Sequence, residues 1–169
     1  MDSYINIISL YRMDKKQLFN IINSILEPIG FKKYKQGVWR RYGSEVSECI
    51  YLQRSAYGRM YYFQCGCIIN DLPLAPGMHY HTFGDFDIPI PINRHLQVLL
   101  DLENQIGDGE RETKLKVCLE QVVPKSAIID TEAELKAYLL KKQLAISRKV
   151  MDYLKIGWAL GKYRDTIRQ

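Results

Sequence analysis

The chain has 169 residues, of which 47% are hydrophobic and 25% are charged, and this composition excludes a largely disordered protein. The length is sufficient to bury a core without disulfide bonds. The formal net charge of +5 is modest, and its distribution, basic at both ends and acidic in the middle, favours an oriented partner over uniform coating of nucleic acid.

The N-terminal segment predicts a helix. Residues 1–12 form an N-terminal extension ahead of Asp14, which has Gln17 three positions later in the pattern of a capping box. Pro28 and Gly30 then end the helix. Apolar residues between these signals recur at helical spacing, so one side of the helix should pack on a sheet: Leu18, Ile21, Ile22, Ile25 and Leu26.

The next part of the chain predicts an antiparallel meander. Segments rich in aromatic and β-branched residues, separated by glycine-containing breaks, indicate strands at 31–35, 38–42, 46–54 and 60–69. Residues 79–83, within a long Pro- and Gly-rich stretch, are a candidate edge strand. The predicted fold class is α+β: an antiparallel four- to five-stranded sheet with an N-terminal helix packed on it and a C-terminal set of helices.

The remainder of the chain predicts helices. A segment that begins after Asn93 is followed by a helix at about 110–122, and Thr131 with Glu134 forms a second capping box. We expect the helix that begins there to continue to Leu154.

These elements predict a single domain over residues 1–169. Its parts are the extension at 1–12, the helix plus meander at 14–93 and the helical part at 94–169. The four cysteines, the absence of a secretory signal and the lack of any apolar run of about 20 residues predict a cytoplasmic protein with reduced thiols and no membrane segment.

The catalytic motifs of common hydrolases, nucleotide-binding proteins and zinc proteases are absent from the sequence, which disfavours an enzyme. The best metal candidate is His79-x-His81 with Asp85, or alternatively Asp87, because imidazole and carboxylate ligands suit zinc or iron. A structural or solvent-facing histidine pair explains the same spacing. We therefore expect no cofactor.

Polar and aromatic residues around the third and fourth strands are candidates for binding. Gln53 and Arg54 end one strand, Tyr57 lies in the turn that follows, and Tyr62 begins the next strand. Together they could line a recognition cleft. Turn chemistry alone accounts equally well for the residues between 55 and 58.

Several short motifs give the chain a resemblance to a known family. They are Leu26-x-Pro28-x-Gly30-Phe31-Lys32-Lys33, Trp39-x-Arg41, Ile50-x-Leu52-Gln53-Arg54-Ser55, Tyr61-Tyr62 and Gly66. In this order, and after a helix, they resemble the bacterial family catalogued as domain of unknown function 4304, over roughly residues 14–140. The resemblance implies the α+β fold and a bacterial cytosolic setting, and it implies no reaction.

Members of that family tend to have a His-centred segment followed by an arginine after the last strand. The resemblance makes His79, His81 and Arg94 the counterparts, and so adds Arg94 to the candidate binding residues. The long Pro-rich stretch between them departs from the compact family pattern, which puts the transfer of a site in doubt.

Three functions remain open from the sequence. The leading hypothesis is a non-enzymatic protein-binding module of an accessory or immunity-like kind, whose partner is another protein. The alternative is a metal-assisted hydrolase that uses the His-x-His loop. A further alternative is weak nucleic-acid binding through the basic ends, although nucleic acid is not the expected partner. The oligomeric state stays undetermined.

Overall fold

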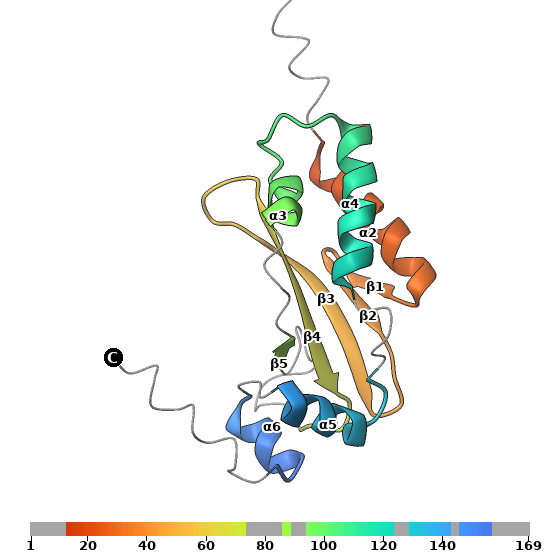
Figure 1. Cartoon of the computed structure of the whole chain (residues 1–169), viewed down its shortest axis with the longest axis vertical. Coiled ribbons are helices and arrows are strands. Elements are labelled where there is room, and N and C mark those ends of the chain that lie inside the picture. Colours follow the sequence, from red (N-terminus) through yellow and green to blue (C-terminus); the bar gives the residue numbers. More distant parts are fainter. Residues whose placement is uncertain (1–12, 74–85, 89–93, 124–128, 143–145, 157–169) are drawn as a thin grey trace, which may run out of the picture.

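The part of the chain that the computed structural model describes comprises residues 13–73, 86–88, 94–123, 129–142 and 146–156. Its centre is a five-stranded antiparallel sheet in which each strand pairs with the next along the chain, in the order β1-β2-β3-β4-β5 (Figure 1). The strands are β1 (Lys32–Lys35), β2 (Val38–Arg41), β3 (Val46–Arg54), β4 (Tyr61–Ile69) and β5 (Phe86–Ile88). The predicted antiparallel meander is confirmed.

The first four strands begin and end within one residue of their predicted positions. Gly37 explains the tight turn between β1 and β2, because its φ of 74° lies in the left-handed region that glycine adopts without steric cost. The fifth strand is Phe86–Ile88, which pairs with β4 over Cys65 to Cys67. The candidate edge strand at 79–83 lies outside the described residues.

Helix α2 (Lys15–Leu26) begins and ends where the sequence predicts. The Asp14 carboxylate accepts a hydrogen bond from the Gln17 backbone N–H at 2.7 Å, and the Gln17 side chain accepts one from the Asp14 N–H at 2.7 Å. This capping box provides hydrogen-bond acceptors for two backbone N–H groups that have no acceptor within the helix. A short 3₁₀ turn, η1 (Glu27–Ile29), and Gly30 at φ 93° end the helix. Its buried residues are Leu18, Phe19, Ile22 and Leu26.

Within the described residues, four helices follow the sheet: α3 (Arg94–Leu100), α4 (Asp108–Val122), α5 (Glu132–Lys142) and α6 (Arg148–Tyr153). The single helix predicted from Thr131 to Leu154 is wrong, because α5 and α6 are separate. Ser147 has an extended backbone and its side chain accepts a hydrogen bond from the Val150 N–H at 3.4 Å, so it caps a new helix. No described helix is long and apolar enough to cross a membrane.

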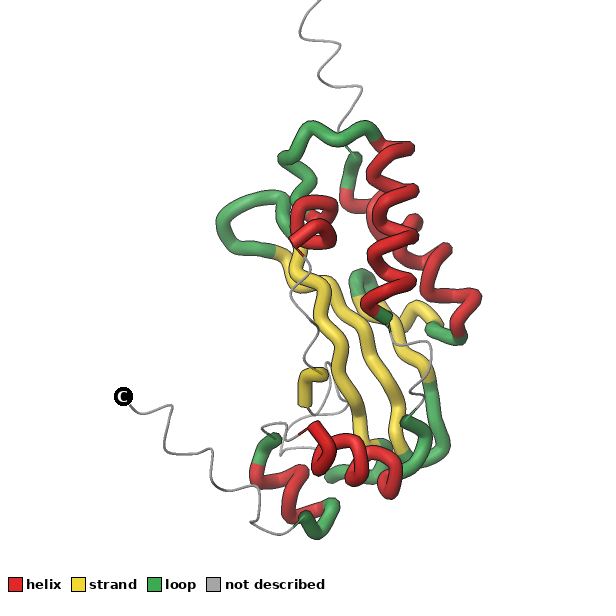
Figure 2. Tube along the Cα trace, viewed as in Figure 1, coloured by secondary structure: helices red, strands yellow, loops and turns green. Residues whose placement is uncertain are grey.

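The helices cover one face of the sheet at two separate places (Figure 2). At one end of the long strands, α2, α3 and α4 pack on Trp39, Ile50 and Tyr61. At the other end, α5 and α6 pack on the side chains of Val46 and Ile69. Residues 46 and 50 have the same parity along β3, so both cores lie on the same face of the sheet.

An ion pair lies between the two cores. Glu48 is flanked along its face of β3 by Val46 and Ile50, and its Oε2 accepts a hydrogen bond from Arg41 Nε at 2.7 Å. Arg41 Nη1 also donates to the carbonyl of Ile29 at 3.2 Å. The pair therefore connects the segment after α2 to the middle of the sheet, at the point where the two apolar clusters adjoin.

The pKa of Glu48 gives a testable pH dependence. Burial raises this pKa above its ordinary value of 4.5. Arg41 and a backbone hydrogen bond from Ile129 lower the pKa, but their combined effect is smaller than that of burial. The folded protein then holds the Glu48 proton more tightly than the unfolded chain does. We expect the free energy of unfolding, relative to that of Glu48→Gln, to fall as the pH rises from about 4 to about 7.

Urea denaturation of both proteins across this pH range measures the difference. The Glu48→Gln variant serves as the reference because glutamine keeps the size of the side chain and one carbonyl acceptor. A rise in the free energy of unfolding relative to Glu48→Gln over the same range would contradict the prediction, since pairing with Arg41 would then outweigh burial.

The opposite face of the sheet is buried at one end and accessible at the other. A third apolar cluster, the one on this face, comprises Val38, Cys49, Tyr51 and Ile68, each at most 7% exposed. Further along the same face, Gln53 and Tyr62 are exposed. The accessible part of this face therefore lies where β3 and β4 meet in their hairpin.

Candidate functional site

The hairpin of β3 and β4 extends beyond the body of the sheet (Figure 1). Gln53 pairs with Tyr62 and Arg54 with Tyr61 across the two strands. The Ser55 N–H donates to the carbonyl of Met60 at 2.8 Å, which closes the turn. Residues 56–59 therefore form the tip of a hairpin whose strands stay in register to their ends.

The connection between α3 and α4 holds the hairpin tip in place. Met60 forms an isolated β-bridge with Asp101, and the Leu102 N–H donates to the carbonyl of Arg59 at 3.2 Å. In addition, Arg59 Nη2 donates to the carbonyl of Met13 at 3.1 Å. The backbone of residues 59 and 60 is thus held against the α3–α4 connection, and the Arg59 side chain reaches the segment before α2. The tip is therefore presented from a fixed base.

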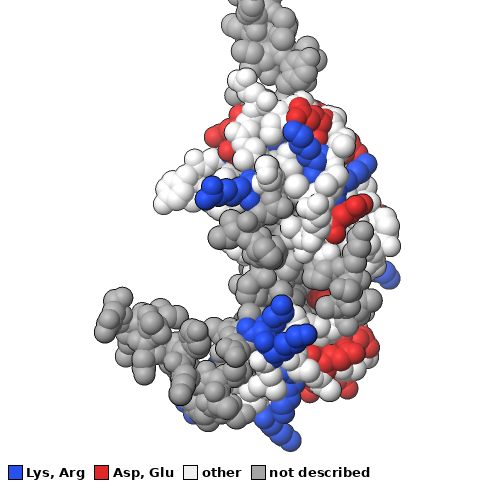
Figure 3. Space-filling model, in the orientation of Figure 1, with Lys and Arg blue, Asp and Glu red and all other residues white. Residues whose placement is uncertain are grey.

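Tyr57 is 99% exposed at this tip. Its backbone N–H donates to the Ser55 hydroxyl at 3.2 Å, which fixes the local turn without involving the phenol ring. Figure 3 shows the tip of the hairpin as a protrusion from the rest of the molecule. Complete exposure is unusual for a tyrosine, whose ring normally buries a large apolar area.

The predicted binding residues lie at the same end of the molecule but do not line a single cleft. Gln53 and Tyr62 share the sheet face away from the helices, and Gln64 Nε2 donates to Gln53 Oε1 at 3.3 Å. Arg54 lies on the other face, because neighbouring residues in a strand alternate. Its partner Tyr61 is buried against Phe19 with ring centroids 5.6 Å apart.

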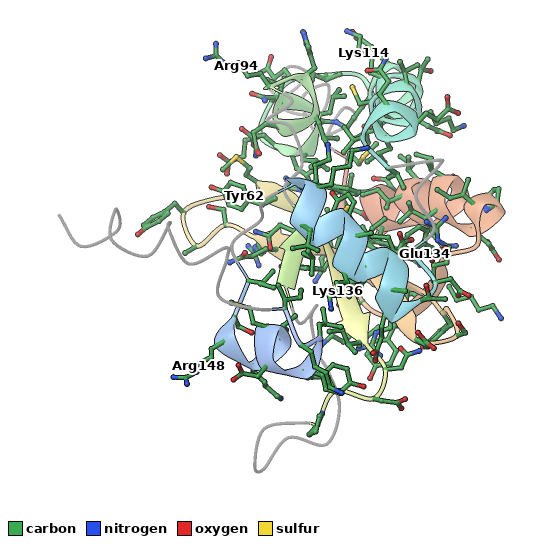
Figure 4. The ribbon with its side chains drawn as sticks, turned by 60° about the horizontal axis from the view of Figure 1, so that its bottom comes forward. Tyr62, Arg94, Lys114, Glu134, Lys136 and Arg148 are labelled. Atoms are coloured by element: carbon green, nitrogen blue, oxygen red, sulfur yellow. The ribbon has the colours of Figure 1, made fainter. Side chains whose placement is uncertain are left out.

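Arg94 is the first residue of α3, the helix that packs against β4 of this hairpin. Gln97 on the same helix donates from Nε2 to the carbonyl of Tyr61 at 3.4 Å, which holds α3 against β4. Figure 4 shows Tyr62 on β4 and Arg94 on α3, with the guanidinium of Arg94 extended outward. We call the exposed residues Gln53, Arg54, Tyr57, Tyr62 and Arg94 the hairpin-end surface.

The charges of the hairpin-end surface are basic. No ion pair joins Arg54 or Arg94 to another residue in the described ranges. The nearby acids are engaged with backbone groups, since Asp101 Oδ1 accepts from the Glu103 N–H at 3.0 Å and Glu103 accepts from the Arg59 N–H at 3.4 Å. Two guanidinium groups therefore remain available to carboxylates of a partner.

The proposed metal ligands His79, His81 and Asp85 lie outside the described residues. Within the described part of the chain, no three His, Cys, Asp or Glu side chains are close enough to hold a metal ion. All four cysteines are buried thiols outside any disulfide, and burial raises the pKa of the Cys118 thiol.

A family model described as a domain of unknown function (DUF4304) matches residues 22–140. The chain belongs to this family. The DUF4304 match includes the whole hairpin-end surface and stops within α5, before α6 begins. No curated protein and no solved structure matches the chain.

Sequence reasoning missed the residues that support the site of this DUF4304 protein. Arg59, Asp101 and Glu103 fix the hairpin tip, yet their side chains and backbone groups meet only because the α3–α4 connection folds back onto β4. The one available signal was the Tyr57-Gly58 pair, since Tyr and Gly in a turn between two strong strands indicate an exposed hairpin tip.

Proposed function

We propose that the chain is a protein-binding module and that the hairpin-end surface contacts its partner. The observation that carries the proposal is the complete exposure of Tyr57 on a hairpin tip that is held by the backbone bridge of Met60 and by the side chain of Arg59. A tyrosine offers a large apolar area and a hydroxyl while it loses little conformational entropy on binding, which is why tyrosines recur at the centres of interfaces.

The basic groups around Tyr57 favour an acidic partner. Arg54 ends β3 and Arg94 begins α3, and neither makes an ion pair with another described residue. Guanidinium groups bind carboxylates through two parallel hydrogen bonds. The partner expected from this chemistry is a protein with an apolar socket for Tyr57 and carboxylates at the rim of that socket.

Site-specific crosslinking tests the proposal. We expect a photoreactive benzoyl-phenylalanine at position 57 to give one discrete protein adduct in cells of the source organism. The same residue at position 117 is the matched control, because Val117 is also exposed, at 52%, but lies on α4 away from the hairpin. The adduct at position 57 should be lost in an Arg54→Ala, Arg94→Ala double variant.

The Tyr57→Ala variant separates binding from folding. Because the side chain is 99% exposed, its removal should change the free energy of unfolding by less than about 0.5 kcal/mol. It should nevertheless abolish capture of the crosslinked protein in a pull-down, whereas Tyr42→Ala, at a tyrosine 61% exposed elsewhere, should not. Equal adducts from positions 57 and 117, or unchanged capture by Tyr57→Ala, would refute the proposal.

A further inference from the structure

A second surface, independent of the hairpin, is formed by the C-terminal helices. Residues 136–155 contain six basic side chains and one acidic side chain, Asp152, a net charge of +5 that equals the formal net charge of the entire chain. The remaining residues therefore sum to zero. We call the six basic residues the α5–α6 basic surface: Lys136, Lys141, Lys142, Arg148, Lys149 and Lys155.

The packing of α5 on α6 brings the helices that carry these side chains together at one end of the molecule. Leu135 and Leu139 of α5 and Val150 of α6 share a single buried cluster, which holds the two helices together. Lys136 Nζ donates to the carbonyl of Lys155 at 3.4 Å, so these two lysines are neighbours across the helix pair. Lys136 on α5 and Arg148 on α6 are both seen in Figure 4, with Arg148 directed outward.

The junction between α5 and α6 carries four of the six basic side chains. α5 ends at Lys142 with Lys141 beside it, and α6 begins at Arg148 with Lys149 next in the chain. Because the connecting segment is short, the end of α5 and the start of α6 carry four cationic side chains within a small region.

One acidic residue of these helices meets the basic surface, since Asp152 pairs with Arg148 at 3.6 Å. Other nearby acids are engaged elsewhere. Glu134 Oε2 accepts hydrogen bonds from the N–H groups of Asp130 and Thr131 at 2.9 and 3.1 Å, at the opposite end of α5. Asp130 itself accepts from the Ser44 hydroxyl at 2.9 Å. Figure 3 shows basic side chains at the bottom of the molecule with an acidic group beside them. Among the described residues, Arg148 is the one member of the basic surface that forms an ion pair.

The chemistry of the basic surface favours phosphate over a structured protein interface. Five of its six residues are lysines, which act as point charges, and Tyr138 and Tyr153 of the same helices are half-buried rather than exposed. Lys141, Lys142 and Lys155 form no ion pair with another residue of the described ranges. Several lysines without an exposed aromatic anchor are typical of contacts to a nucleic-acid backbone.

We propose that the α5–α6 basic surface binds the phosphate backbone of nucleic acid without sequence specificity. Each lysine or arginine that meets a phosphate releases a condensed counterion, so the affinity falls steeply with salt. With about four such contacts, affinity for a DNA duplex should decrease on the order of 100-fold between about 50 and about 200 mM salt.

Fluorescence anisotropy with a labelled DNA duplex of random sequence tests this surface in the full chain. The Lys141→Ala, Lys142→Ala variant should bind about 10-fold more weakly at low salt, and its salt slope should be smaller by about two contacts. The matched control is Lys114→Ala, Lys116→Ala, which removes the same charge from α4, where the two lysines pair with Glu110 and Glu112 at 2.5 and 2.9 Å.

The control variant should retain nearly full affinity, because its lysines already have carboxylate partners. Equal loss in both variants would mean that only net charge matters and would overturn the assignment to α5 and α6. Undetectable binding at about 50 mM salt would overturn it as well. So would stronger binding to vesicles of anionic lipid than to DNA, an outcome that the exposed Leu140, at 45%, makes worth measuring.

Discussion

Replacing Arg111 with methionine will lower the free energy of unfolding by about 3–5 kcal/mol. Arg111 is only 1% exposed although it carries a charge. Its Nη1 donates to the carbonyls of Leu99 and Asp101 at 2.5 and 3.0 Å, and its Nη2 donates to the carbonyl of Asn104 at 2.8 Å. Methionine keeps the apolar stem and removes all three hydrogen bonds.

The three carbonyls explain the size of this effect. α3 ends at Leu100, so the Leu99 carbonyl is one of the acceptors that a helix leaves unpaired at its C-terminus. Arg111, which projects from α4, supplies the missing donor and also fixes the connection that supports the hairpin tip. Burial lowers the pKa of Arg111, while Asp108 and Asp101 oppose that change, so the charged form keeps acidic neighbours.

Urea denaturation measures the loss, and Arg148→Met is the matched control. The side chain of Arg148 is 68% exposed and pairs with Asp152 on the surface of α6 at 3.6 Å, so its loss should cost less than about 0.5 kcal/mol. The loss of unfolding free energy in Arg111→Lys should lie between those of Arg111→Met and Arg148→Met, because one ammonium group cannot donate to all three carbonyls as the guanidinium does. If Arg111→Met were as stable as Arg148→Met, the proposed role of Arg111 as a clamp would be wrong.

Gly43→Ala will lower the free energy of unfolding by about 2–3 kcal/mol. A Cβ at this position would lie 2.1 Å from the Val46 carbonyl oxygen and 2.6 Å from Asp130 Oδ1. The first contact is with the backbone and cannot be relieved by a change of rotamer. The expected loss of stability comes from this steric clash and not from the backbone conformation, since Gly43 is not among the glycines with positive φ.

The clash would also disturb the attachment of α5. Asp130 accepts backbone hydrogen bonds at its carbonyl from Glu45 and Val46, both at 3.0 Å, and its Oδ1 accepts from the Ser44 N–H at 2.8 Å. We therefore expect amide hydrogen exchange in α5 to accelerate in Gly43→Ala, more than exchange in α2. Equal acceleration in both helices would instead indicate global destabilisation.

Gly109→Ala is the matched control for this substitution. Gly109 lies in the first turn of α4, and a Cβ there would meet no atom within 4 Å. Alanine should consequently stabilise the protein by about 0.5–1 kcal/mol, because it has the higher helix propensity. A loss of stability in Gly109→Ala, or none in Gly43→Ala, would contradict the steric explanation.

The sequence was informative about the hairpin-end surface only in part. Gln53, Arg54, Tyr57 and Tyr62 could be selected because they flank a turn between two evident strands. Their distribution over both faces of the sheet follows from strand alternation. The contacts that fix the tip, such as the bridge from Met60 to Asp101, join segments some forty residues apart, and no local pattern predicts such pairs.

What the sequence determined by itself is the local structure. The Asp14–Gln17 capping box, the alternation along β3 and β4 and the turn at Gly37 involve neighbouring residues, so hydrogen bonding and steric preference fix them within a few positions. The wrong prediction of one helix across α5 and α6 also has a local cause. Apolar residues at helical spacing continue through the segment that ends at Ser147, and this periodicity was given more weight than the Ser147 hydroxyl, which caps the start of α6.

Only the tertiary structure decided the rest. From the sequence, Arg111 is predicted to be one more exposed charge on a helix. In the structure its side chain is buried against the end of α3 and donates a hydrogen bond to the Leu99 carbonyl. From the sequence, Gly43 is an ordinary turn residue. In the structure Asp130, almost ninety positions away in the chain, occupies the space beside it. In both cases the physical reason is long-range packing, which places atoms next to each other without any trace in the local sequence.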